Sequence, residues 1–462
     1  MPPSSDSARP LTNRERSEIQ AGQFEMRSLS MSLVRSGGGQ EFNGPGYVSM
    51  DADGDLAFTL FDIQGDSRVA MTWWGRRRGW ISEDEYFDLE VRELSGRIWQ
   101  ASRIVPYVED ANLGLPGVVL RGTLSELWHR GTREKEGKSS VRSYFPGTTK
   151  LPLFQSTKTT RERGDQAAEG YARDHQGYEA AGFRVHLETV EDGFWVSVRP
   201  PPSLEATAPH LRSEESIWLL VGTPLHASLV ETWYPGDHIV RIRPRKPARF
   251  KPRLTPPIPL SDPRFSDSHG QLLCRYLAYV WEHPVEAYHP VSTRVFDVLR
   301  ASSLSVVAEA RAVSIAVETL AKGPLAELAP VSAKHKSAVS DLKDYLGDWK
   351  GDPRIRDRAI GAVGNFSTAR AGDVLRAAEA LGLLTGDEFR DWTKLRNSSA
   401  HGDDPKGPIT EFADRSERVW GLFSKLVFQI IRFDGEWVAP GVVDGRSTPF
   451  APVSVPGAIG SK

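Results

Sequence analysis

The chain has 462 residues, enough for about three domains of roughly 150 residues and for at least two separate hydrophobic cores. Its single cysteine, Cys274, excludes an intrachain disulfide and a cysteine-based zinc cluster, and its 60 acidic and 58 basic residues nearly cancel. Since no stretch approaches the roughly 18 apolar residues of a membrane span and the start has no signal-peptide core, we expect a cytoplasmic protein without membrane partners.

The amino-terminal half is expected to be rich in strands. Residues 1–20 are polar and are predicted to form a disordered leader. Two runs of alternating apolar residues surround the turn signal Asp53-Gly54, which is typical of a β-hairpin. Further strands are predicted at residues 118–124, 182–187, 193–198, 217–221 and 238–242. We therefore expect a β-rich domain over residues 21–245, of sandwich or jelly-roll type, with an irregular excursion around residues 130–175.

The carboxy-terminal part is expected to be helical. Residues 246–265 are basic and proline-rich and are predicted to form a linker, because proline interrupts helices and the stretch has little to bury. Beyond it, apolar residues recur at spacings of three and four, which indicates helices. These helices are predicted at residues 272–281, 295–320, 331–346, 369–383, 386–400 and 410–433. We expect a helical bundle over residues 266–435 and a flexible tail at 436–462, which makes the fold class α+β with two domains.

The segment RNSSAH, at residues 396–401, is the best candidate for a functional site. Gly402 and Pro405 stop the predicted helix, so Arg396 lies in its last turns and His401 at its end. Five positions correspond to about 140° around an ideal helix, so the two side chains do not share one face. They converge only through a bend at the helix end or across a dimer.

RNA cleavage without a metal requires these residue types. Imidazole titrates near neutrality and can take a proton from the 2′-hydroxyl or give one to the leaving 5′-oxygen. A guanidinium places forked donors on the charge that develops at the phosphate. Asn397 is expected to orient the phosphate or the histidine ring, and Ser398 and Ser399 are candidates for a supporting role. We expect neither a metal nor a cofactor.

This arrangement resembles the Arg-x4–6-His motif of the HEPN superfamily, in which a polar residue, here Asn397, follows the arginine. As in that superfamily, the motif precedes a long last helix. Glu318, on an upstream helix, resembles an acidic residue of the long HEPN helix, which implies that it orients the arginine. Many HEPN proteins are metal-independent ribonucleases that act as dimers. The resemblance therefore implies an RNA substrate such as tRNA, the catalytic residues Arg396 and His401, and a homodimer formed through the helical domain.

The layout of the whole chain is similar to that of the ApeA group of bacterial anti-phage proteins. In the amino-terminal half, the similarity depends on the segment FNGPG at residues 42–46 and on the hairpin that follows. The resemblance implies an abortive-infection effector, in which the β-rich domain senses a phage-derived trigger or restrains the nuclease.

Two alternatives for the helical domain remain open. A second Arg-x4-His pair, Arg264 and His269, lies in a proline- and serine-rich stretch rather than at a helix end. Arg396 could also pair with a neighbouring carboxylate while His401 caps the helix. The helical domain would then be a non-catalytic dimerisation module in a sensor that binds a ligand or a protein.

Two arginine-rich segments are candidates for RNA contact, because a nearly neutral chain needs a local basic patch to bind nucleic acid. The first contains Arg76, Arg77 and Arg78 between tryptophans, and its alternative is a buried tryptophan core with an arginine-rich turn. The second contains Arg243 and Arg245, and its alternative is a solvated linker.

Overall fold

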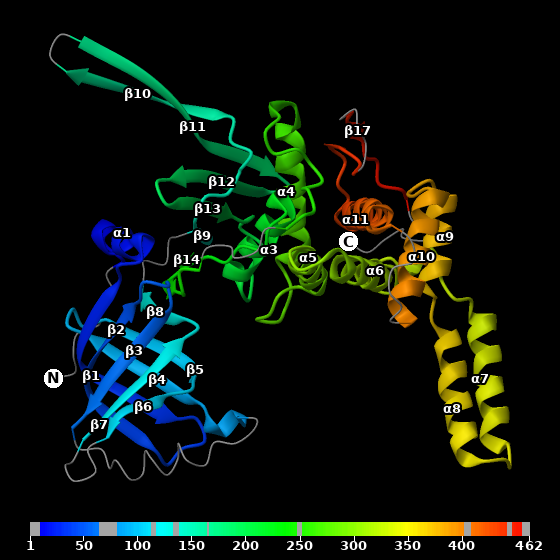
Figure 1. Cartoon of the computed structure of the whole chain (residues 1–462), viewed down its shortest axis with the longest axis horizontal. Helices are drawn as coiled ribbons and strands as arrows, with labels where there is room; N and C mark the ends of the chain where they lie inside the picture. The colour runs from blue at the N-terminus through cyan, green and yellow to red at the C-terminus, as the bar shows by residue number, and fades with distance from the viewer. Residues whose placement is uncertain are drawn as a thin grey trace. The chain divides into compact units, whose positions relative to one another are not determined.

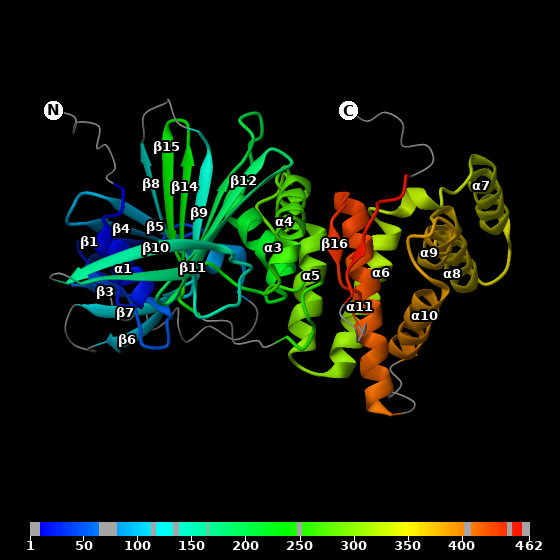
Figure 2. The same cartoon turned by 90° about the horizontal axis from the view of Figure 1, so that it is seen from above.

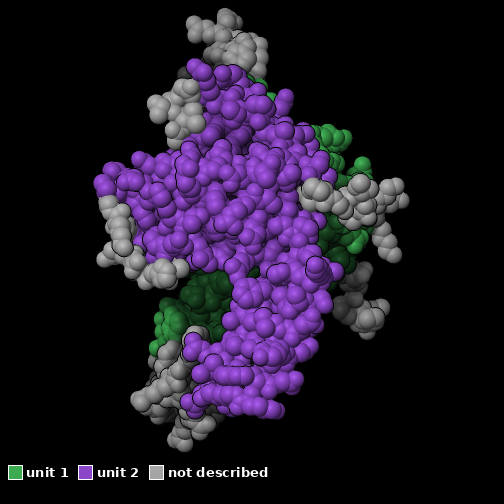
Figure 3. Space-filling view, turned by 90° about the vertical axis from the view of Figure 1, so that its right-hand side faces the viewer, with its two compact units in different colours: residues 1–217, 225–249, 280–287 green, residues 218–224, 250–279, 288–462 purple. Residues whose placement is uncertain are grey.

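A computed structural model describes residues 10–63, 81–111, 117–132, 138–163, 166–246, 252–401, 408–440 and 446–454, without the side chains of residues 110–111, 158–163, 166–171 and 399–401. The chain divides into two compact units (Figure 3). Unit 1 comprises Met1–Ile217, Leu225–Arg249 and Val280–Ala287, and unit 2 comprises Trp218–Pro224, Phe250–Tyr279 and Tyr288–Lys462. Strands occupy residues 25–242 and helices residues 263–431, so the predicted α+β organisation is confirmed (Figure 1).

Unit 1 is built on one continuous antiparallel sheet, which has fifteen strands among the described residues (Figures 1 and 2). The strands are β1 Glu25–Arg35, β2 Glu41–Met50, β3 Leu56–Asp62, β4 Phe87–Glu93, β5 Ile98–Ile104, β6 Tyr107–Ala111, β7 Val118–Leu124, β8 Leu127–Thr132, β9 Ser140–Pro146, β10 Gln155–Arg163, β11 Gln166–Ala180, β12 Phe183–Val190, β13 Gly193–Arg199, β14 Leu229–Tyr234 and β15 Asp237–Ile242. Their order is β10-β11-β12-β13-β9-β14-β15-β8-β5-β4-β1-β2-β3-β7-β6.

The predicted hairpin around Asp53-Gly54 is confirmed as β2 and β3. Asp51 holds its turn, because its Oδ1 accepts hydrogen bonds from the backbone N–H groups of Asp53 and Asp55. The two strands approach closely at Gly44, where a Cβ atom would lie 2.0 Å from the carbonyl oxygen of Phe61. Strand pairing alone therefore explains this glycine of the FNGPG segment.

The predicted leader contains a helix, α1 Asn13–Ala21, so the prediction of disorder is wrong for its described part. Thr12 and Glu15 form a capping box, in which each side chain accepts a hydrogen bond from the other residue's backbone N–H. Arg16 then makes a forked ion pair with the buried carboxylate of Glu231 on β14, at 2.8 and 3.0 Å. Local capping and this distant pair together order a segment that is polar in composition.

Two further predictions for the first half are wrong. Residues 217–221, predicted as a strand, are the last turns of helix α3 Pro209–Val221. A run of five apolar residues has no period that separates a buried strand from a buried helix. The region around residues 130–175 is regular rather than irregular, since it contains β9, β10 and most of β11.

Unit 2 is mainly helical. Its helices are α4 Ser266–Val280, α5 Pro290–Ser302, α6 Val306–Lys322, α7 Ala333–Asp348, α8 Pro353–Gly364, α9 Ala371–Ala380, α10 Gly386–His401 and α11 Ile409–Ile431, with short 3-10 turns at Pro263–Phe265, Ala326–Leu328 and Asn365–Ser367. Five of the six predicted helices are confirmed, with the largest difference at the start of α4, which begins six residues earlier than predicted. The single helix predicted at 295–320 is wrong, because α5 and α6 are separated there by Ser305, whose hydroxyl caps α6. Helix α8 was not predicted, although Asp352 caps its start.

The segments on either side of the helices also pack against them. In the predicted linker, Leu254 and Ile258 are buried, and the carbonyl oxygen of Thr255 accepts a hydrogen bond from the indole of Trp420 on α11. In the described part of the predicted tail, Val453 and the side chain of Gln429 on α11 exchange two hydrogen bonds of 2.8 Å. The linker therefore has apolar residues to bury, and residues 446–454 make contacts with α11.

His269 on α4 gives unit 2 a predicted sensitivity to acid. Burial lowers its pKa to about 4, although a backbone hydrogen bond to Pro259 and the carboxylate of Asp262 act in the opposite direction. In the unfolded chain the His269 imidazole is protonated below about pH 6.5, whereas in the folded chain it is protonated only below about pH 4. Protonation therefore favours the unfolded state between these values, and stability falls as the pH falls from 6.5 to 4. When the pH is lowered from 7 to 5, the free energy of unfolding measured with urea should fall in both proteins. We expect the fall to be about 2 kcal/mol smaller in His269→Gln than in wild type. Equal losses in the two proteins would contradict this assignment.

Candidate functional site

Helix α10, which carries the RNSSAH segment, is fixed along its length by buried side chains. At its start, Thr385 and Glu388 form a capping box, with Glu388 Oε2 accepting from the Thr385 N–H at 2.8 Å. Further along, Trp392 and Leu395 are buried, and the indole N–H of Trp392 donates to the carbonyl oxygen of Ser314 on α6. The helix is therefore anchored to α6 one turn before the candidate arginine.

Ion pairs connect the same helix to α11. The carboxylate of Asp391 accepts from Arg415 at 3.3 Å and from Arg418 at 2.7 Å. Glu388 pairs with Lys425 at 2.8 Å. Because Asp391, Arg415, Glu388 and Lys425 are all less than a fifth exposed, these pairs are better shielded from solvent than ordinary surface pairs. They hold α10 between α6 and α11.

Arg396 lies at the surface beside the acidic residue singled out from the sequence. Its Nε is 3.4 Å from Oε2 of Glu318 on α6, and its side chain is 46% exposed, against 23% for Glu318. Glu318 also accepts from Lys322, one turn further on α6, at 2.5 Å. Burial acts to raise the pKa of Glu318, but the hydrogen bond from Lys322 and the charges of Lys322 and Arg396 lower it overall. The carboxylate is therefore ionised near neutral pH and keeps the guanidinium in place.

The other residues of the segment are less fully described. Asn397 is exposed, and the Ser398 hydroxyl donates to the carbonyl oxygen of Leu395 within the helix. His401 is the last residue of α10, but its side chain and that of Ser399 lie outside the described residues. The structure thus brings Glu318 and Arg396 together and places the backbone of His401 just over one turn beyond the arginine.

The second Arg-x4-His pair is not available for catalysis. Arg264 forms a forked pair with Asp262, while His269 is fully buried in α4. Arg264 is exposed, but the imidazole of His269 is buried and is therefore out of reach of a substrate.

The residues predicted to contact RNA do not form a surface patch in the described chain. Arg76, Arg77 and Arg78 lie outside the described residues. Arg243 makes ion pairs with Glu126 and with the buried Glu214, at 2.6 and 2.7 Å. The side chain of Arg245 lies against Gly22, and its Nε is buried. Both linker arginines therefore have roles within unit 1, which argues against direct contact with RNA.

Sequence reasoning missed Lys322, the second partner of Glu318. Its position four residues after Glu318 on the same helix is a sequence signal for this pair. Among the described residues, no group of three or more histidine, cysteine or acidic side chains is placed to hold a metal ion. None of the described helices combines the length and apolar character needed to cross a bilayer.

Comparisons of the chain with protein families, with curated proteins and with solved structures return no match.

Proposed function

We propose that this chain is a metal-independent endoribonuclease, with Arg396 and His401 as its catalytic pair and Asn397 in support. The observation that carries the proposal is the position of Arg396, half-exposed on a firmly anchored helix and held by the Glu318 carboxylate. Pairs as exposed as this one contribute roughly 0–1 kcal/mol to stability, so folding alone gives little reason for the arrangement. An oriented, accessible guanidinium that lies near the end of a helix, on the same helix as a histidine, is suited to bind a phosphodiester and to stabilise the charge that develops when it is cleaved.

In the proposed reaction, the imidazole of His401 takes the proton of the RNA 2′-hydroxyl, and the 2′-oxygen attacks the adjacent phosphorus. The bond to the 5′-oxygen breaks, and the protonated imidazole gives its proton to that oxygen as it leaves. Arg396 stabilises the negative charge on the phosphate oxygens as it develops. The products are a 2′,3′-cyclic phosphate and a 5′-hydroxyl. Because one chain supplies one Arg-His pair, we propose that two chains join their helical units to complete the cleft.

The proposed biological setting is antiviral defence inside a bacterial cell, in the cytoplasm. This setting depends on the resemblance to the ApeA group and HEPN proteins, with tRNA as one candidate substrate. The β-rich unit 1 would then restrain the nuclease until a phage-derived trigger binds.

The test is an RNA cleavage assay in EDTA, with total RNA and a tRNA pool as substrates. We expect wild-type protein to cut RNA and to leave 2′,3′-cyclic phosphate ends. The double variant Arg396→Ala/His401→Ala, purified in the same way, controls for contaminating nuclease and should leave the RNA intact with an unchanged circular dichroism spectrum.

Two results would contradict the proposal. Cleavage that disappears in EDTA would indicate a metal-dependent reaction. Intact RNA with the wild-type protein, together with harmless expression in cells, would favour the non-catalytic dimerisation module instead.

A further inference from the structure

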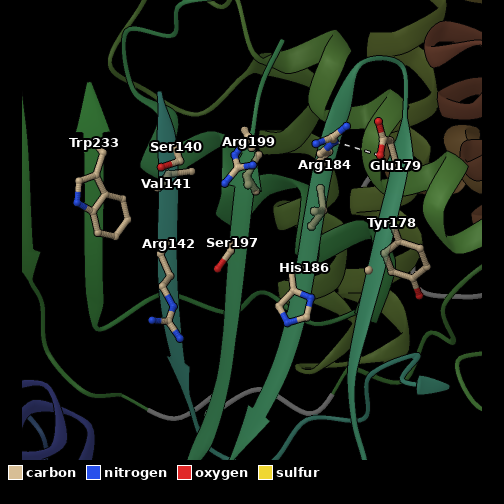
Figure 4. Close-up of a pocket in the computed structure, with 13 residues that line it drawn as sticks. Ser140, Val141, Arg142, Tyr178, Glu179, Arg184, His186, Ser197, Arg199 and Trp233 are labelled. Atoms are coloured by element: carbon tan, nitrogen blue, oxygen red, sulfur yellow. Dashed lines mark ion pairs between the residues drawn. The ribbon is translucent and has the colours of Figure 1, made fainter. Parts of the chain in front are cut away.

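Part of the sheet of unit 1 has one packed face and one open face. The strands β11, β12, β13, β9 and β14 lie side by side in that order. On the packed face, the hydroxyl of Ser143 is 2.7 Å from that of Ser213 on α3. Side chains alternate between the faces of a strand, and the register places Arg142 opposite Ser197 and Ser197 opposite His186 on the other face. That open face is polar and carries several arginines together with the carboxylate of Glu179 (Figure 4).

The open face carries a cavity of about 580 Å³, within the range of small-ligand sites. Three arginines from three strands line it: Arg142 from β9, Arg199 from β13 and Arg184 from β12 (Figure 4). Trp233 on β14 stands at one side of it. A smaller adjoining hollow adds Lys138 next to Arg199 and Trp233.

Part of the positive charge on this face is not neutralised by ion pairs within the described chain. Neither Arg199 nor Lys138 has an ion pair among the described residues, and both are exposed. Arg184 pairs with Glu179 at 3.1 Å, but both side chains are more than 60% exposed, so the pair is weak and easily exchanged. Arg142 is the most fixed of the cations, because it pairs with Glu188 at 3.3 Å and lies over the Trp195 ring at 4.2 Å. The surface therefore suits a ligand with several negative charges.

The spread of the charges favours a chain of phosphates over a single one. The three arginines lie on β9, β13 and β12, so they span two strand spacings of about 4.8 Å, or roughly 10 Å. One phosphate cannot span that distance, whereas successive phosphates of a strand can. Trp233 is partly exposed, and its ring lies parallel to that of His238 with centroids 5.2 Å apart, so the exposed part of the indole is a stacking surface for a base.

We propose that the open face of β14, β9, β13, β12 and β11 binds a single strand of nucleic acid, with phosphates on Arg142, Arg184 and Arg199 and a base on Trp233. Binding here does not require the cleavage proposed for α10. The sequence gives no sign of this face, because its cations come from separate strands that only the pairing of the sheet brings together.

The test measures binding of a fluorescent 12-nucleotide oligo(U) by anisotropy, using the full-length chain with His401→Ala in EDTA to prevent cleavage. Adding Lys138→Glu and Arg199→Glu should weaken binding at least tenfold. In a plot of the logarithm of the binding constant against the logarithm of the salt concentration, the slope should become less steep by about 0.7 for each phosphate that no longer contacts a cation. Adding Trp233→Leu should weaken binding about tenfold without changing that slope, because the residue carries no charge.

The matched control is Arg27→Glu/Arg92→Glu, which makes the same charge change at exposed sites on β1 and β4, at least four strands beyond β14 in the sheet. Equal binding by this control and by Lys138→Glu/Arg199→Glu would overturn the proposal. Competition by ATP or by polyglutamate as strong as that of unlabelled oligo(U) would overturn it too, since the face would then take a mononucleotide or an acidic peptide. An oligo(dU) arm distinguishes RNA from DNA, which supply the same phosphates.

Discussion

Replacing Arg396 with lysine is expected to slow RNA cleavage about 100-fold, although the positive charge is retained. The loss has a geometric cause. Arginine keeps Nε near Glu318 while its other nitrogens remain available, whereas lysine offers one compact ammonium that cannot bond the carboxylate and a phosphate in the same forked manner. Removing one preorganised donor from a transition state typically costs about 10²–10³ in rate. The measurement is the single-turnover rate on a defined RNA, in EDTA, at saturating protein.

The matched control is Arg390→Lys. This residue lies on the same helix, pairs with Asp387 and is 69% exposed. We expect its rate to remain within about twofold of wild type, because the arginine lies outside the proposed site. Equal rates for the two lysine variants would show that Arg396 has no part in the reaction. A loss of helix signal in Arg396→Lys would instead give it a structural role.

The sequence predicted those features whose signals are local. The hairpin at Asp53-Gly54 follows from a turn dipeptide between alternating runs, and the start of α10 follows from Thr385. In each case the residues that determine the structure lie within a few positions of it.

Features that depend on distant residues could not be predicted in this way. Arg243 lies in a basic segment that is typical of an RNA contact, but its partners Glu126 and Glu214 are distant in the sequence and become its neighbours only when unit 1 folds. Residues 217–221 are all apolar, so they show neither the alternation that indicates a strand nor the three- to four-residue spacing that indicates a helix. Glu318, 78 positions before Arg396, came from a family resemblance and not from a pattern in the chain.

Arg253 offers a second large effect, this time on stability. Its guanidinium is 2.8 Å from Oε1 of Glu309 on α6, and the same oxygen accepts from the Ser416 hydroxyl on α11 at 2.7 Å. Glu309 is fully buried. Replacing Arg253 with alanine leaves a buried carboxylate without its cation, so we expect the free energy of unfolding to fall by about 3 kcal/mol, measured with urea at pH 7. Arg264→Ala, which breaks the exposed pair with Asp262, should cost less than about 1 kcal/mol.

A double variant separates the buried charge from the packing of the side chain. In Glu309→Gln, the amide oxygen can still accept the hydrogen bond from Ser416, but the side chain carries no charge. Removing the Arg253 guanidinium from this variant therefore leaves no unpaired anion. We therefore expect Arg253→Ala/Glu309→Gln to recover about 2 kcal/mol relative to Arg253→Ala alone. If the double variant were no more stable than Arg253→Ala, the destabilisation would come from removing the apolar stem of the arginine. In that case the predicted linker would be held to the helices by packing rather than by this charge pair.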